Sequence, residues 1–152
     1  MSELTRRFQE ESNRIEGITR PVHDSEVEAP TLFLGLGALD NAAVERLVDV
    51  FEPGAHLRVR RGSNVRVGGH VPPRGGPGMV IHLENLLFSV NHQLDTPWRL
   101  HCRYEGLHPF TDGSGRSGRA IWAWQMLFEN RRPGISLGFL HAFYYQTLEN
   151  FQ

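Results

Sequence analysis

Apolar residues recur every three or four positions along much of the chain, a spacing that places them on one face of an α-helix. They predict a first helix over about 3–16, which ends at Gly17. A later helix begins near Gly115 and is broken by Pro133 and Gly134. The same periodicity predicts four more helices, over about 40–51, 78–93, 97–107 and 136–150. The predicted fold class is therefore all-α.

Residues 57–67 follow a different pattern, in which apolar and basic positions alternate. Leu57-Arg58-Val59-Arg60 and Val65-Arg66-Val67 flank the turn Arg61-Gly62-Ser63-Asn64. Alternation with a period of two is typical of strands, so one small β-hairpin is predicted here. The segments 18–38 and 68–78 contain several Gly and Pro residues and are predicted to be a connector and a loop.

Length and charge narrow the class of protein. The chain has 152 residues, which fits a single domain, and its formal net charge is −1. A balanced charge gives no general attraction to nucleic acid or to an anionic membrane, so neither is an expected partner. The sequence contains no lysine, and all 16 basic residues are arginine. Any phosphate must therefore be bound by arginine, by backbone N–H groups or by a metal ion.

The cysteine content and the polar N-terminus bear on location. Cys102 is the single cysteine, so no disulfide can form within the chain. The sequence shows no long apolar run and no apolar segment behind Met1–Arg7, so neither a membrane span nor a signal peptide is expected. A cytoplasmic location is predicted, and an effector delivered into another cell by a dedicated machine would have the same features.

The stretch from His108 to Arg119 reads His-Pro-Phe-Thr-Asp-Gly-Ser-Gly-Arg-Ser-Gly-Arg and concentrates the candidate chemistry. Gly113 and Gly115 lie just before a predicted helix, where exposed N–H groups and the helix dipole bind anions. Arg116 and Arg119 are three residues apart and share a face of that helix. The pattern indicates binding of a polyphosphate. Asp112 is a candidate ligand for a divalent cation. His108 is a candidate base that can accept a proton near neutral pH.

This stretch resembles the active-site motif of the Fic family, H-x-F-x-[D/E]-G-N-G-R-x-x-R. The departure from the motif is Ser114, where the family usually has Asn. The resemblance implies a single Fic domain over 1–152, with the catalytic core over about 40–152. It also implies transfer of a nucleoside monophosphate, most often AMP from ATP, to a Ser, Thr or Tyr hydroxyl of a target protein.

The resemblance assigns a role to each motif residue. His108 is the expected general base, Asp112 the expected Mg²⁺ ligand, and Phe110 the buried anchor of the loop. The amides from Gly113 to Gly115 are expected to bind phosphate oxygens. Ser114 offers a single hydroxyl in place of the family amide, which implies weakened or altered catalysis. The expected arginine contacts are the β-phosphate for Arg116 and the γ-phosphate for Arg119.

A second match lies near the N-terminus, where Ser12-Asn13-Arg14-Ile15-Glu16-Gly17 fits the Fic inhibitory motif [S/T]-x-x-x-E-[G/N]. The resemblance makes residues 1–17 an N-terminal inhibitory helix. Glu16 is expected to form an ion pair with Arg119 and to keep the γ-phosphate from that arginine. Ser12, one turn earlier, is expected to help hold the helix, and Gly17 to end it.

The predicted hairpin corresponds to the family's flap, which docks the target. Val65, Arg66 and Val67 are the expected docking residues, and the basic side chains favour an acidic partner or keep the edge strand from aggregating. Several alternatives remain open at this point. They are removal of AMP from a modified target, use of another nucleotide donor, a weakly catalytic module that binds nucleotide or protein, and self-association into a homo-oligomer.

Overall fold

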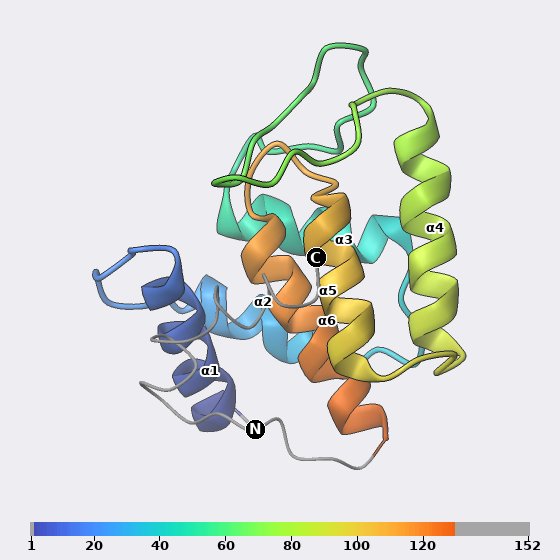
Figure 1. Cartoon of the computed structure of the whole chain (residues 1–152). Helices are drawn as coiled ribbons and strands as arrows, with labels where there is room; N and C mark the ends of the chain where they lie inside the picture. Colours follow the sequence, from blue (N-terminus) through green and yellow to red (C-terminus); the bar gives the residue numbers. More distant parts are fainter. Residues whose placement is uncertain (1, 130–152) are drawn as a thin grey trace.

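Six helices account for the regular structure of residues 2–129, the part of the chain that the computed structural model describes. The helix predicted over 136–150 and the break at Pro133 and Gly134 lie outside the described residues. The all-α fold class is confirmed. The helices are α1 (Ser2–Ile15), α2 (Ser25–Leu34), α3 (Asn41–Phe51), α4 (Gly78–Asn91), α5 (Pro97–Leu107) and α6 (Ser114–Phe128), shown in Figure 1.

Five of the predicted helices occur close to their predicted limits, and side-chain caps explain two of their starts. The Asp40 carboxylate accepts a hydrogen bond from Ala43 N at 2.8 Å and begins α3. The Thr96 hydroxyl accepts one from Arg99 N at 3.3 Å and begins α5, whose first residue is Pro97. These caps agree with the limits read from the sequence.

The helix α2 was not predicted, because its segment was interpreted as a connector. Pro30 lies inside α2, where proline removes one backbone hydrogen bond. Its apolar residues Val27, Pro30 and Phe33 are nevertheless buried, and α2 packs against α1, α3 and α6. Burial of apolar side chains against three neighbouring helices stabilises α2 more than Pro30 destabilises it. This stabilisation cannot be seen from the Gly and Pro residues of the segment alone.

The predicted hairpin is wrong in its pairing. Within residues 2–129 the arms 57–60 and 65–67 form no ladder with each other. Leu57 instead forms an antiparallel bridge with Phe110, supported by Arg58 N bonded to Pro109 O and Thr111 N bonded to His56 O, both at 2.9 Å. The first arm thus pairs with the motif loop, and the rest of the segment is an irregular loop that returns to α4.

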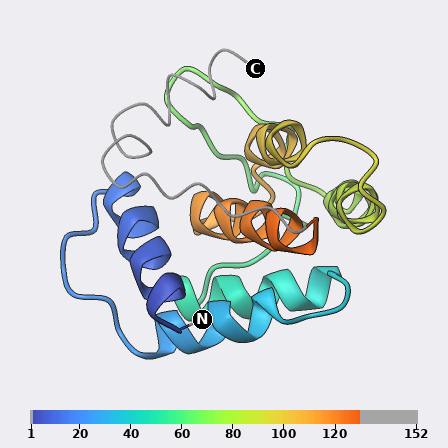
Figure 2. The ribbon, with the colours of Figure 1, turned by 90° about the horizontal axis from the view of Figure 1, so that it is seen from below.

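The helix α6 is the centre of the fold. It contacts α1, α2, α3 and α5, and Figure 2 shows it enclosed by them. Ala120, Ile121 and Trp124 are buried in the main apolar core, as the helical spacing predicts, while Phe128 is 49% exposed and stacks on Trp124. The first turns of α6 carry Arg116 and Arg119 of the motif. The buried core that holds α6 therefore also fixes the positions of these arginines.

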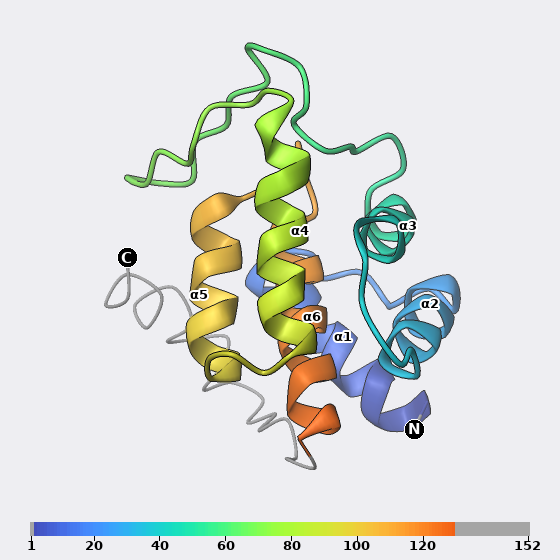
Figure 3. The same ribbon diagram turned by 90° about the vertical axis from the view of Figure 1, so that its right-hand side faces the viewer.

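The long segment 52–77 and the turn between α5 and α6 lie at the same end of the helix bundle (Figures 1 and 3). Both segments carry sequence-predicted site residues, and the bridge between Leu57 and Phe110 joins them. None of the helices within residues 2–129 is long and apolar enough to cross a membrane.

Candidate active site

The predicted anion site lies at the N-terminus of α6. Gly113 precedes the helix with a φ of 76°, a conformation that glycine adopts without strain. The N–H of Ser117 makes an early backbone bond of the helix, 3.0 Å from Gly113 O. The N–H groups of residues 114–116 therefore lie in the first turn, which has no intrahelical acceptors and is where helices bind anions.

Ser114 is turned into the loop and not toward the face where a phosphate would bind. Its hydroxyl is buried, accepts a hydrogen bond from Phe110 N at 3.1 Å and lies 3.5 Å from Phe110 O. Phe110 itself has no exposed surface, as expected for the anchor of the loop. The serine therefore braces the turn from inside, a role that the comparison with the family Asn did not suggest.

The hydroxyl of Ser117 supports the same turn through the carbonyl of Gly113. The Tyr104 hydroxyl lies 2.7 Å from Ser117 Oγ, which in turn lies 2.8 Å from Gly113 O. Both side chains are fully buried between α5 and α6. Buried hydroxyls that satisfy each other and a backbone carbonyl make a rigid support. The glycine turn is thus held by two serines that belong to α6 itself.

Arg119 is held by the end of α1, as the sequence predicts. Its guanidinium donates to the Glu16 carboxylate at 2.6 Å, to the Ser12 hydroxyl at 2.7 Å and to Ser12 O at 3.0 Å. The Arg119 side chain is 2% exposed, whereas the Glu16 side chain is 31% exposed. A short ion pair that is sheltered on the arginine side is stronger than a surface pair.

Two glycines allow Glu16 to reach Arg119. Gly17 has a φ of 75°, and its N–H bonds to Arg14 O while Ile18 N bonds to Asn13 O, both at 2.9 Å. This pair of bonds is the Schellman motif, which ends α1 at Ile15 and makes Glu16 the residue that caps the helix. Across the contact, a Cβ at Gly115 would collide with the Glu16 carboxylate. The carboxylate therefore lies against the first turn of α6, where an anion is expected.

Arg116 is also paired with a carboxylate, but one that the sequence analysis missed. Its guanidinium donates to Glu52 at 2.5 Å and to Phe51 O at 3.3 Å, and it lies 5.3 Å from the centre of the Phe51 ring. The Arg116 side chain is 2% exposed. The residue ties α6 to the end of α3, so a contact with a β-phosphate would require exchange of Glu52 for that phosphate.

His108 ends α5 in the left-handed conformation, with φ 46° and ψ 64°. Burial is the main cause that lowers its pKa from 6.5 to about 4, and the positive charge of Arg58 lowers it further. Glu16 and Asp112 act in the opposite direction, and His70 lowers the pKa slightly. The imidazole is therefore neutral at pH 7, which is the form able to accept a proton.

Arg58 was predicted to lie on the basic flap but is completely buried. Its guanidinium donates to Leu107 O, His108 O, Ser63 O and Pro73 O at distances between 2.7 and 3.1 Å. Burial lowers its pKa from the usual value, although arginine stays charged near neutral pH. An alternating basic pattern cannot distinguish one buried arginine from its exposed neighbours.

Asp112 is exposed at the tip of the turn, and its carboxylate accepts a hydrogen bond from Gly113 N at 2.7 Å. Residues 2–129 contain no group of three or more His, Cys, Asp or Glu side chains that could hold a metal ion together. One exposed carboxylate still suits Mg²⁺, because that ion keeps several waters and takes phosphate oxygens as its other ligands.

The expected docking residues lie on the loop that follows Arg58. Val65 and Val67 are half-buried and Arg66 is exposed. His70 fixes the loop a few residues later, with its Nε2 at 2.9 Å from Gly106 O. The loop therefore lies against the end of α5, beside His108.

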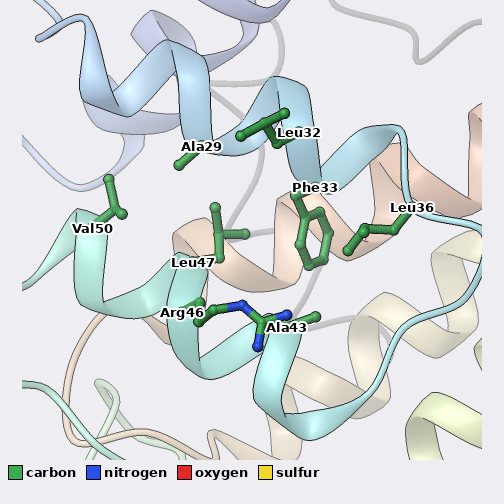
Figure 4. Close-up of a pocket in the computed structure, with 8 residues that line it drawn as sticks. All are labelled: Ala29, Leu32, Phe33, Leu36, Ala43, Arg46, Leu47 and Val50. Carbon is green, nitrogen blue, oxygen red and sulfur yellow. The ribbon is translucent and has the colours of Figure 1, made fainter.

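An apolar pocket of about 230 Å³ lies away from this site, between α2 and α3. Figure 4 shows Leu32, Phe33 and Leu47 around it, with Arg46 extending along its edge. None of the motif residues line this pocket. The concave apolar surface and the charged site are thus separate features of the described residues.

Comparison with known proteins gives one informative match. No family model matches the chain. Over 82 residues the chain is 39% identical to a protein from Aedes aegypti named protein adenylyltransferase Fic. The match covers 49% of this chain, and the chain spans only 15% of the length of that relative. The match supports a Fic-like relationship over about half of the chain.

Proposed function

We propose that this chain transfers AMP from ATP to a hydroxyl side chain of a protein. The observation that carries the proposal is the arrangement at the start of α6. A glycine turn, a buried arginine and a neutral histidine come together in the order of the Fic motif. The partial similarity to an adenylyltransferase supports the same reaction. Polyphosphate binding and proton abstraction are the two tasks that these groups suit.

The proposed reaction uses His108 as general base. Its neutral ring accepts the proton of a Ser, Thr or Tyr hydroxyl while that oxygen attacks the α-phosphorus of ATP. The bond between the α-phosphorus and the bridging oxygen breaks, and pyrophosphate leaves. N–H groups in the first turn of α6 and Arg119 bind the phosphate oxygens, and Arg116 joins them in exchange for Glu52.

Mg²⁺ is the expected co-substrate ion, and Asp112 is the residue that would hold it. When bound, the ion neutralises charge on the polyphosphate. The exposed carboxylate of Asp112 is compatible with this role because it leaves room for phosphate oxygens and water.

Glu16 is proposed to keep the enzyme inactive. Its carboxylate takes the Arg119 donor that the γ-phosphate needs, and it lies beside Gly115 in the first turn of α6. In-line attack requires the reacting atoms within about 3–3.5 Å, so a displaced triphosphate blocks transfer. Release of α1 from Arg119 would then activate the site.

The target is proposed to dock on the loop between Arg58 and α4. Arg60, Arg61, Arg66 and Arg74 are exposed there, and none of them forms an ion pair with a described residue. Residues 53–83 contain no Asp or Glu. This excess of positive charge beside His108 favours a target whose hydroxyl lies among acidic residues.

Removal of AMP is a second candidate that uses the same residues. Glu16 is partly exposed and its charge acts on His108, which supports a role for its carboxylate in orienting a water for attack on an AMP-modified target. A Glu16→Gly variant would gain transfer but lose removal.

The proposal is tested by the intact mass of the protein after incubation with ATP and Mg²⁺. Three proteins are compared: wild type, Glu16→Gly and Glu16→Gly/His108→Ala. A gain of one AMP in the Glu16→Gly protein alone is expected. A gain that persists without His108 would contradict its role as base, and a gain equal in wild type would contradict inhibition by Glu16.

A further inference from the structure

Arg58 binds the backbone on both sides of the candidate base. Its Nε donates to His108 O at 2.7 Å, its NH2 to Leu107 O at 2.9 Å, and its backbone N–H to Pro109 O at 2.9 Å. One residue thus bonds three consecutive carbonyls around His108. The carbonyls at the end of a helix have no intrahelical donors and carry partial negative charge, so a buried cation there is stabilised.

His108 needs such support because its backbone is left-handed. A non-glycine residue in this region is less stable by roughly 1–2 kcal/mol and persists where its surroundings fix it. The His108 N–H is bonded to Tyr104 O at 2.9 Å, and its carbonyl is bonded to Arg58. Both backbone polar groups of the residue that carries the imidazole are therefore fixed.

The other side of the guanidinium holds the long loop. NH1 donates to Ser63 O at 3.1 Å and to Pro73 O at 2.9 Å, and Gly76 N donates to Arg58 O at 2.8 Å. Within residues 2–129 all the hydrogen bonds of the buried side chain go to carbonyl oxygens. A buried cation that pairs with no carboxylate of these residues is unfavourable unless its donors are satisfied, and here four of its five N–H donors are used.

We propose that Arg58 is a positioning residue for His108, fixing the backbone from which the imidazole projects and tying the docking loop to it. This inference rests on the proposed role of His108 as base. The positive charge of Arg58 also disfavours the protonated imidazole, as does His70, whereas Glu16 on α1 and Asp112 on the motif turn favour it. Geometry and charge therefore have separable effects.

The test compares Arg58→Met, Arg58→Lys and Arg58→Met/His108→Ala, with Arg103→Met as the control from an exposed position on α5. NMR titration follows the imidazole of His108, identified by its absence from the double variant. Arg58→Met should raise the His108 pKa from about 4 toward 6.5, and Arg58→Lys should leave it low because the charge remains. A folded Arg58→Met protein with a His108 pKa matching that of Arg103→Met would overturn the electrostatic part.

Transfer activity, measured in the Glu16→Gly background, tests the positioning part. Misplacement of a base by about 1 Å lowers the rate by on the order of 10²-fold, so kcat should fall by that order in Arg58→Met while KM for ATP changes little. Arg58→Lys should recover part of kcat, because an ammonium retains up to three donors. Equal kcat in Arg58→Met, Arg58→Lys and Arg103→Met would overturn the inference.

The two kinds of readout separate this inference from the proposed function. If Glu16→Gly alone shows no transfer, the proposed function fails, while the His108 titration and amide exchange at Leu107, His108 and Phe110 still decide the role of Arg58. If Arg58→Met does not fold, Arg58→Lys decides: faster amide exchange at Leu107, His108 and Phe110 with a lower kcat supports positioning, and exchange and kcat like those of Arg103→Met contradict it.

Discussion

Replacement of Glu16 by Gln should increase the affinity for ATP and leave the affinity for ADP almost unchanged. The Glu16 carboxylate lies 2.6 Å from the Arg119 guanidinium, whose side chain is 2% exposed. A hydrogen bond to a charged group contributes roughly 1.5–3 kcal/mol, and the γ-phosphate must replace this one. At about 1.4 kcal/mol per tenfold change, the variant should bind ATP roughly 10- to 150-fold more tightly.

Titration calorimetry with ATP and ADP, both with Mg²⁺, measures this difference. ADP lacks the γ-phosphate, so it reports any effect that does not pass through Arg119. Glu10→Gln, on the same helix, is the matched control and should change neither affinity, because Glu10 forms no ion pair with a described residue. An equal gain for ATP and ADP, or no gain for ATP, would refute competition between Glu16 and the γ-phosphate.

Three further predictions follow from the site. The kcat/KM of Glu16→Gly should be constant from about pH 8 to about pH 5 and fall only below about pH 4, because neutral His108 is the base, its pKa is about 4 with Glu16 present, and loss of the Glu16 charge lowers that pKa further; a midpoint near 6.5 would contradict the lowered pKa. Ser114→Ala should reduce the free energy of unfolding by about 1–3 kcal/mol in urea denaturation, since the buried Phe110 N–H loses its acceptor. Ser114→Thr keeps a hydroxyl acceptor and should therefore retain most of the wild-type free energy of unfolding. Arg61→Glu/Arg66→Glu should lower modification of peptides whose hydroxyl is flanked by acidic residues and raise it for basic ones; an unchanged ranking at low salt would contradict docking on this loop.

Much of the fold follows from local patterns in the sequence. The helices α3 and α5 have apolar periodicity, and each begins with a side-chain cap whose hydrogen-bond partner is three residues further along the chain. The helix α2 lacks a clear local signal, because Pro30 and the flanking Gly and Pro residues argue against it. Its stability comes from burial against other helices, which a reading of one segment cannot include.

The site shows the same division. The contact between Glu16 and Arg119 was predicted because two separate motifs implied it. The pairing of Arg116 with Glu52 was missed, because an acidic residue at the end of a helix is common and has no motif around it. Arg58 was placed on the surface by its alternating neighbours, and only the three-dimensional path of residues 52–77 reveals its burial. Ser114 was read by comparison with Asn, although its geometry bonds it to the loop backbone.

The most direct test of the central claim follows the phosphorus atoms of ATP. The Glu16→Gly protein is incubated with Mg²⁺ and ATP labelled at either the α- or the γ-phosphorus, with itself and a mixed protein extract as acceptors. AMP transfer predicts that the Glu16→Gly protein gives protein-bound label from the α-position and none from the γ-position. When His108 is also replaced by Ala, no protein-bound label is expected from either position. Label from the γ-position, or α-label that persists without His108, would contradict the account.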